Sequence, residues 1–113
     1  MRLRWLGQAG FVVPSGDHTI VIDPYLSDSL AEKYAGTLFE HDRAYPPPVD
    51  PNELRCDLVI CTHRHTDHMD GQTLRALVAA NPELRVCVPR AVVDHALGLE
   101  LPADRLVAMS AGI

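Results

Sequence analysis

Three histidines and one aspartate lie within six consecutive positions, at His63, His65, Asp67 and His68. Imidazole nitrogens and carboxylate oxygens are both ligands of divalent metals. The alternative for this cluster is a run of solvated loop histidines, or histidines that are hydrogen-bonded within a core. Such a reading suits a lone histidine, whereas this density and spacing favour metal binding.

The preceding segment explains how these side chains could share a pocket. Asp57–Cys61 is an apolar run of the kind that forms a strand buried on both faces of a sheet. A loop at the carboxyl end of such a strand can turn alternate side chains into one site. We therefore expect His63 and His65 to bind one cation, and Asp67 and His68 to bind a second cation beside it.

The chemistry of such a site is hydrolysis. Two divalent ions roughly 3.5 to 4 Å apart can share a water molecule and lower its pKa toward about 7. Hydroxide is then available at neutral pH as a nucleophile. Among the cluster residues we assign the catalytic role to Asp67.

Two further carboxylates qualify for supporting roles by their position. Asp23 ends the β-branched run Thr19–Ile22, where it either orients a metal-bound histidine or the bridging water, or forms an Asx turn before Pro24. Asp70 could support the pocket in the same way. As the N-cap of a helix that follows the cluster, however, it has a sufficient structural explanation, which we favour.

The remaining histidines and two arginines are not part of a comparable cluster of metal-ligand side chains. His18, His41 and His95 are predicted to be surface or cap residues. Arg43 and Arg64 could bind an anionic group of a substrate, but a solvated charge is the favoured interpretation for both.

The first half of the chain predicts a small antiparallel meander. Its strands are expected around Leu3–Trp5, Phe11–Val13 and Thr19–Ile22, separated by turn-prone residues. A short helix is predicted near Ser29–Tyr34, and the proline-rich Tyr45–Pro51 is predicted to be a surface loop.

The second half alternates predicted strands and helices. A helix should follow Asp70, with Leu74, Leu77 and Val78 on one face, and end at Asn81-Pro82. The subsequent predicted elements are a strand at Arg85–Val88, a helix opened by Pro89 that runs through Leu97 to a stop signal at Gly98, and a strand at Leu106–Met109.

Composition narrows the class of protein. The chain has 113 residues, 47% of them hydrophobic, and a formal charge of −5 without a basic stripe, so nucleic acid is not an expected partner. Neither an apolar segment of the roughly 20 residues that span a bilayer nor a signal peptide is found, so we expect no membrane association and a cytoplasmic location. Cys56, Cys61 and Cys87 form no CxxC pair and are expected to be reduced core thiols.

The cluster has the form HxHxDH, which resembles the signature of the metallo-β-lactamase superfamily. The resemblance covers nearly the whole chain. Within the superfamily, the sequence is similar to the branch typified by L-ascorbate-6-phosphate lactonase. It is carried by Trp5–Phe11, Ile22–Ser29, Cys56–Asp70 and Leu101–Arg105.

The resemblance implies an α/β fold, the αββα sandwich, in which a mixed sheet has helices on its outer face. It also implies two divalent ions, manganese or zinc, at His63, His65, Asp67 and His68, with Asp23 supporting the site. Hydroxide on these ions would attack a lactone or ester in a small anionic or lactone substrate. A related branch with a similar motif cleaves phosphodiesters of lipids. The sequence does not determine the oligomeric state, and a homo-oligomer is one possibility.

Members of this family supply a third histidine, a bridging aspartate and a last histidine from a second half of the domain. We therefore expect residues 1–113 to be a partial domain, its N-terminal half. The competing hypothesis is a truncated, catalytically silent metal-binding module. An RNA-processing function is disfavoured by the acidic charge balance.

Overall fold

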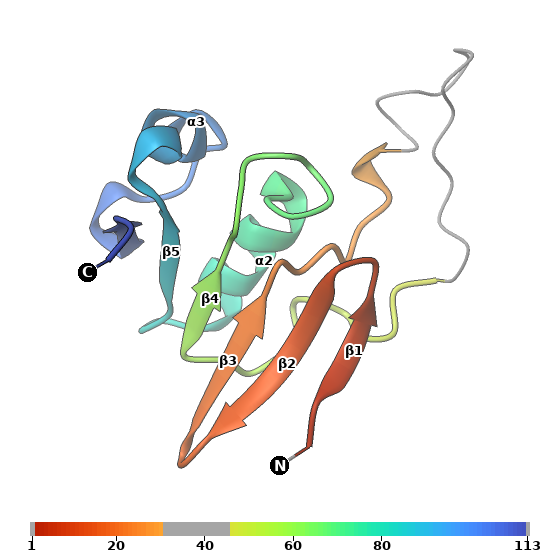
Figure 1. Cartoon of the computed structure of the whole chain (residues 1–113). Helices are drawn as coiled ribbons and strands as arrows, with labels where there is room; N and C mark the ends of the chain where they lie inside the picture. The colour runs from red at the N-terminus through yellow and green to blue at the C-terminus, as the bar shows by residue number, and fades with distance from the viewer. Residues whose placement is uncertain (1, 31–45, 113) are drawn as a thin grey trace.

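A six-stranded mixed sheet forms one layer of the molecule, and its strands are ordered as they occur in the chain (Figure 1). The computed structural model describes residues 2–30 and 46–112. The strands are β1 (Arg4–Gly7), β2 (Gly10–Ser15), β3 (His18–Ile22), β4 (Leu58–Ile60), β5 (Arg85–Pro89) and β6 (Leu106–Met109). The predicted α/β class with a mixed sheet is confirmed.

The first three strands form the antiparallel meander that the sequence predicted. From β3 onward every neighbouring pair is parallel, so each connection must cross from one end of the sheet to the other. The carboxyl ends of β3 and β4 consequently lie at the same edge of the sheet, which is where the histidine loop begins.

The helix α2 (Gly71–Ala80) connects β4 to β5 and begins where the sequence predicted. The Asp70 side chain is its N-cap and accepts a hydrogen bond from the Thr73 backbone N–H. Leu74 and Leu77 are fully buried, and Asn81 ends the helix by donating from its side-chain amide to the Leu77 carbonyl oxygen. Because α2 starts directly after the histidine loop, its first turn fixes the end of that loop.

The connection from β5 to β6 differs from the predicted single helix. Pro89 is the last residue of β5 and has an extended backbone, with ψ of 138°. Proline fixes φ at a value that suits both a strand end and a first helical turn, so φ alone does not decide between them. The chain continues as a 3-10 turn, η1 (Arg90–Val92), the short helix α3 (Val93–Gly98) and a second 3-10 turn, η2 (Ala103–Arg105).

The two faces of the sheet are buried to different extents. On one face Val21, Val59 and Val86 are neighbours across β3, β4 and β5, and they are fully buried in the core that includes Leu77 of α2. The prediction that β4 is buried on both faces was wrong, because Leu58 and Ile60 are only partly buried.

The opposite face carries an apolar row that crosses all six strands. Register pairs align the row Trp5, Phe11, Ile22, Ile60, Cys87 and Val107. Trp5 is 53% exposed and Val107 is 37% exposed. The described helices pack on the other face of the sheet, so this row stays partly open to solvent.

Some predicted features lie at the limits of the described residues. Ser29 and Leu30 are helical, whereas the rest of the predicted short helix, together with His41, Arg43 and Tyr45, lies outside the described residues. Pro46–Pro51 forms neither helix nor strand, as predicted. Among the described residues, no helix is both long and apolar enough to cross a membrane.

Candidate metal centre

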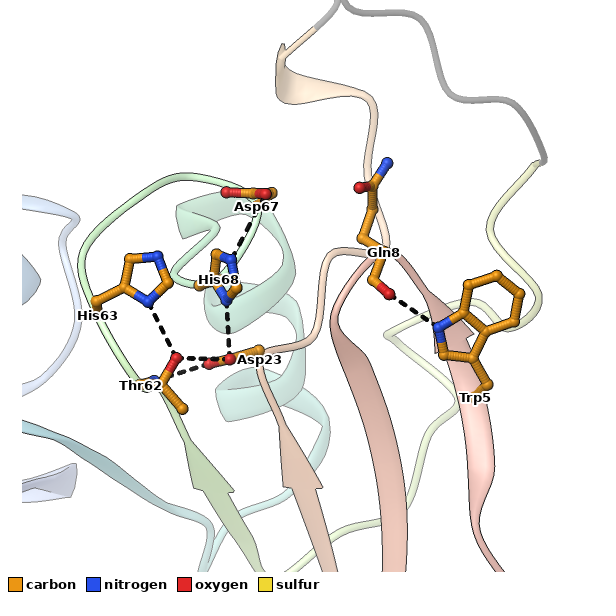
Figure 2. Close-up of polar contacts among 7 residues, drawn as sticks. All are labelled: Trp5, Gln8, Asp23, Thr62, His63, Asp67 and His68. Carbon is orange, nitrogen blue, oxygen red and sulfur yellow. Dashed lines mark hydrogen bonds and ion pairs between the residues drawn. The ribbon is translucent and has the colours of Figure 1, made fainter.

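The histidine loop and Asp23 meet at one edge of the sheet (Figure 2). Asp23 follows β3, and its backbone N–H donates to the Ile60 carbonyl oxygen of β4 at 2.9 Å. Cys61 continues β4 by donating to the Cys87 carbonyl oxygen, also at 2.9 Å. Parallel pairing therefore carries the Asp23 backbone up to the point where the loop after β4 begins.

The loop folds tightly enough to bring the imidazoles of all three histidines together. The backbone N–H groups of His68 and Met69 both donate to the His65 carbonyl oxygen at 2.8 Å. The ring centroids of His63 and His68 are 3.8 Å apart, and those of His63 and His65 are 4.8 Å apart. The three imidazoles that the sequence singled out are thus neighbours in space.

Asp67 lies beside His68. Its Oδ2 atom is 3.6 Å from His68 Nε2, and the two side chains are 36% and 18% exposed. The two residues predicted to bind the second cation are therefore adjacent, with the carboxylate on the more open side of the pair.

Asp23 is engaged with the histidine loop through both of its carboxylate oxygens. Oδ1 accepts the Thr62 backbone N–H at 2.7 Å, while Oδ2 accepts the Thr62 hydroxyl at 2.7 Å and lies 2.8 Å from His68 Nδ1. The side chain is 5% exposed, so these contacts replace the hydrogen bonds to water that the carboxylate loses on burial.

The backbone of Asp23 is held in an uncommon conformation, with φ of 45°. Aspartate tolerates this left-handed region better than most residues, although it still carries some strain. A side chain at Gly10 would place its Cβ 2.9 Å from the Asp23 carbonyl oxygen, so the start of β2 packs directly against this residue.

Asp70 uses its carboxylate differently. It accepts the hydroxyls of Ser27 at 2.6 Å and Ser29 at 2.8 Å, in addition to the Thr73 backbone N–H. These partners are hydroxyls and an N–H of α2, not imidazoles. The N-cap interpretation is confirmed, and a supporting role for Asp70 in the pocket stays a prediction.

The donor set fits a divalent metal by its chemistry, since imidazole and carboxylate are both suitable ligands. Within residues 2–30 and 46–112, however, no three His, Cys, Asp or Glu side chains are arranged to hold one ion. Two donors per ion, as predicted for His63 with His65 and for Asp67 with His68, fall short of the three that catalytic zinc sites use.

The other singled-out residues are at the surface, Arg64 within the histidine loop itself. His18 is exposed and lies 3.7 Å from the carboxylate of Asp57, and His95 and Arg64 are also exposed. Surface positions for these residues were predicted correctly.

The cysteines are thiols of the sheet and its surroundings. Cys56 and Cys61 are buried and Cys87 is partly buried, and all three are free. Burial raises the pKa of Cys56 to about 11 and, together with the nearby Asp23 charge, raises the pKa of Cys61 to about 12. The prediction of reduced core thiols agrees with these positions.

Sequence reasoning missed Thr62. The residue lies at the carboxyl end of β4 and contacts both Asp23 and His63, whose Nδ1 atom is 3.0 Å from the Thr62 hydroxyl. The signal in the sequence was a hydroxyl residue directly before the first histidine of the cluster.

The sheet is mixed, and its histidine-rich loop follows the carboxyl end of a central strand, β4. A family model described as the beta-lactamase superfamily domain matches residues 2–103. The chain belongs to this superfamily.

Curated relatives agree with this assignment. A metal-dependent hydrolase of Aeropyrum pernix is 31% identical over 96 residues, which are 84% of this chain and 32% of that protein. An N-acyl-phosphatidylethanolamine-hydrolyzing phospholipase D of Caenorhabditis elegans is 30% identical over 87 residues, 75% of this chain and 23% of that protein.

The fold is shared with the crystal structure of isothiocyanate hydrolase from Delia radicum gut bacteria. The TM-score is 0.74 at 23% identity, over 97% of this chain and 42% of that one. The chain thus spans about a third of the Aeropyrum relative and less than half of the solved structure.

Proposed function

We propose that the protein is a metal-dependent hydrolase that acts on a lactone or ester. One observation carries the proposal: the imidazoles of His63, His65 and His68 converge at the carboxyl end of β4, with Asp67 beside them. The structural requirements of the sheet do not call for three histidines at this edge, whereas a metal site does.

His63 and His65 would hold one divalent ion, and Asp67 and His68 a second, either manganese or zinc. Bound ions would lower the pKa of a water molecule and polarise the carbonyl group of the substrate. The chain itself orients the donors: Asp23 contacts Nδ1 of His68, which turns Nε2 of that ring toward Asp67.

Asp67 is the residue to which we assign the catalytic role. Its carboxylate is beside His68 and more exposed than that ring. A carboxylate in this place can orient a water molecule and accept its proton.

The resemblance of the sequence to lactonases supports a small lactone or anionic ester as substrate. A phosphodiester is the second candidate, because the nematode relative is named as hydrolysing N-acyl-phosphatidylethanolamine. A catalytically silent metal-binding module is the third, because the described residues offer two donors per predicted ion.

Metal content, measured by elemental analysis of the purified protein, tests the proposal. We expect about two divalent ions per chain, their loss in the His63→Ala/His65→Ala variant, and their retention in the His95→Ala control, which changes an exposed histidine of α3. Metal content near zero in the unchanged protein would contradict a site that residues 1–113 complete by themselves.

Hydrolysis assays then separate the substrate classes. The metal-loaded protein should open lactones, and the Asp67→Asn variant should be slower by about 100-fold or more. Turnover of phosphodiesters alone would favour the second candidate, and full metal content without turnover of either class would favour the silent module.

A further inference from the structure

The Thr62 hydroxyl lies between Asp23 and His63. Its oxygen is 2.7 Å from Asp23 Oδ2 and 3.0 Å from His63 Nδ1. A hydroxyl has a single proton to donate, so the two contacts cannot both be donated by Thr62.

The direction of these hydrogen bonds follows from the chemistry of the groups. An ionised carboxylate can only accept. If Thr62 gave its proton to His63, two oxygens would face each other at 2.7 Å with no proton between them, which is repulsive. Thr62 therefore donates to Asp23 and accepts from His63, so Nδ1 of His63 carries the proton and Nε2 keeps its lone pair.

The same carboxylate sets the proton of His68. Asp23 Oδ2 lies 2.8 Å from His68 Nδ1 and accepts, so Nδ1 of this ring is also the protonated nitrogen. Its Nε2, which lies 3.6 Å from Asp67 Oδ2, then keeps the lone pair that could bind a metal ion.

From this geometry we propose that Thr62 is a positioning residue that passes the influence of Asp23 to His63. One carboxylate thereby fixes the ring tautomers of His63 and His68, and so prepares one donor in each of the two predicted metal pairs. The metal part of this inference rests on the proposed function, whereas the tautomers are a property of the chain without metal.

The arrangement has an energetic consequence for metal binding. A neutral imidazole in water exchanges its proton between both nitrogens, and a ring held in one tautomer and orientation binds metal without that loss of freedom. Changes in partners of metal-bound histidines typically cost 10- to 100-fold in affinity. We expect a loss of about tenfold or more in affinity at His63 when the Thr62 hydroxyl is removed.

Nuclear magnetic resonance of the metal-free, ¹⁵N-labelled protein reads the tautomers directly. Spectra that correlate ring nitrogens with ring protons should be recorded at about pH 8.5, roughly two units above the ordinary pKa of a free histidine side chain. His63 and His68 should show a protonated Nδ1 and an unprotonated Nε2, whereas the exposed His95 should show exchange between both forms.

Two variants of Thr62 separate a positioning role from a merely structural one. Thr62→Val keeps the shape and the backbone N–H that donates to Asp23, and it should release His63 to exchange while His68 is unchanged. Thr62→Ser should restore the protonated Nδ1 of His63. Thr66→Val, in the same loop, is the matched control and should leave both rings as they are.

The Asp23→Ala variant tests whether one carboxylate governs both rings. Both His63 and His68 should lose the protonated Nδ1 state. A protonated Nδ1 on His63 that persists in Thr62→Val or in Asp23→Ala overturns the inference, as does an Nε2-protonated His63 in the unchanged chain.

Metal titration by calorimetry adds the second readout. Thr62→Val should weaken binding about tenfold or more and Thr62→Ser should recover it; equal affinities in all variants would overturn the metal part of the inference. If the protein proves not to hydrolyse any substrate, the tautomer result still stands, so the two proposals fail separately.

Discussion

The imidazole of His68 and the carboxylate of Asp23 are separated by 45 positions in the sequence, yet Nδ1 of the first lies 2.8 Å from Oδ2 of the second. Parallel pairing of β3 with β4 creates this contact, because it places the ends of both strands at one edge of the sheet. The same carboxylate receives two hydrogen bonds from Thr62. Asp23 is thus the common partner of the residues on both sides of the loop.

Replacement of Asp23 by alanine should destabilise the fold by about 3 kcal/mol, since three partly buried hydrogen bonds from Thr62 and His68, each worth about 1 kcal/mol, would be lost. Asp23→Asn should cost less, because the amide oxygen still accepts and asparagine tolerates the positive φ of 45°. Urea unfolding of both variants measures the difference. An alanine variant as stable as the asparagine variant would show that these hydrogen bonds contribute little.

Replacement of Asp70 by alanine should destabilise the protein by about 2 kcal/mol or more without a change in metal affinity. The carboxylate caps α2 and holds Ser27 and Ser29 against its start. Asp94→Ala is a suitable control, because Asp94 is an exposed acidic residue in the first turn of α3. Thermal unfolding and calorimetric metal titration test the two halves of the prediction, and a large loss of affinity in Asp70→Ala would assign this residue to the pocket.

Two leucines on different helices should respond very differently to truncation. Leu77 of α2 is fully buried, so Leu77→Ala should lower the free energy of unfolding by about 2 to 5 kcal/mol. The loss comes from the missing contacts and from the cavity left behind. Leu97 of α3 is 41% exposed, and Leu97→Ala should cost about 0.5 kcal/mol. Chemical denaturation of the two variants provides the comparison; similar losses would contradict the placement of the core on the α2 face.

The cysteines should react in an order set by burial. At neutral pH, a thiol reagent should modify the partly buried Cys87 first, whereas Cys56 and Cys61 should react only on unfolding. Mass spectrometry of the labelled protein identifies the sites. Rapid labelling of Cys61 in the folded protein would show that the core opens readily.

The buried thiol of Cys61 should also make stability depend on alkaline pH. Its pKa rises from the ordinary 9.0 to about 12 in the folded chain, so the unfolded chain loses this proton first. The stabilising contribution is complete below about pH 9 and is lost as pH rises toward the folded value. The decline in unfolding free energy between about pH 9 and 11 should therefore be shallower in Cys61→Ala than in the unchanged protein; equal slopes would contradict the assignment.

Much of the local structure could be predicted because it is encoded by neighbouring residues. Alternating and continuous apolar runs specified the strands, and the Asp70 cap with its apolar spacing specified α2. The β5–β6 connection was predicted less well, because Pro89 satisfies the φ requirement of a strand end and of a helix start alike. Burial of β4 was overestimated, because an apolar run does not reveal which face of a strand receives a helix.

The sequence by itself determined the donor set, since His63, His65, Asp67 and His68 are adjacent in the chain and a single loop must hold them together. Only the tertiary structure decided how these donors are oriented. Asp23 and Thr62 reach each other through the parallel pairing of β3 with β4, a contact between residues 39 positions apart. Strand order and register fix that contact, and neither follows from local spacing, because they depend on which strands pair when the core closes.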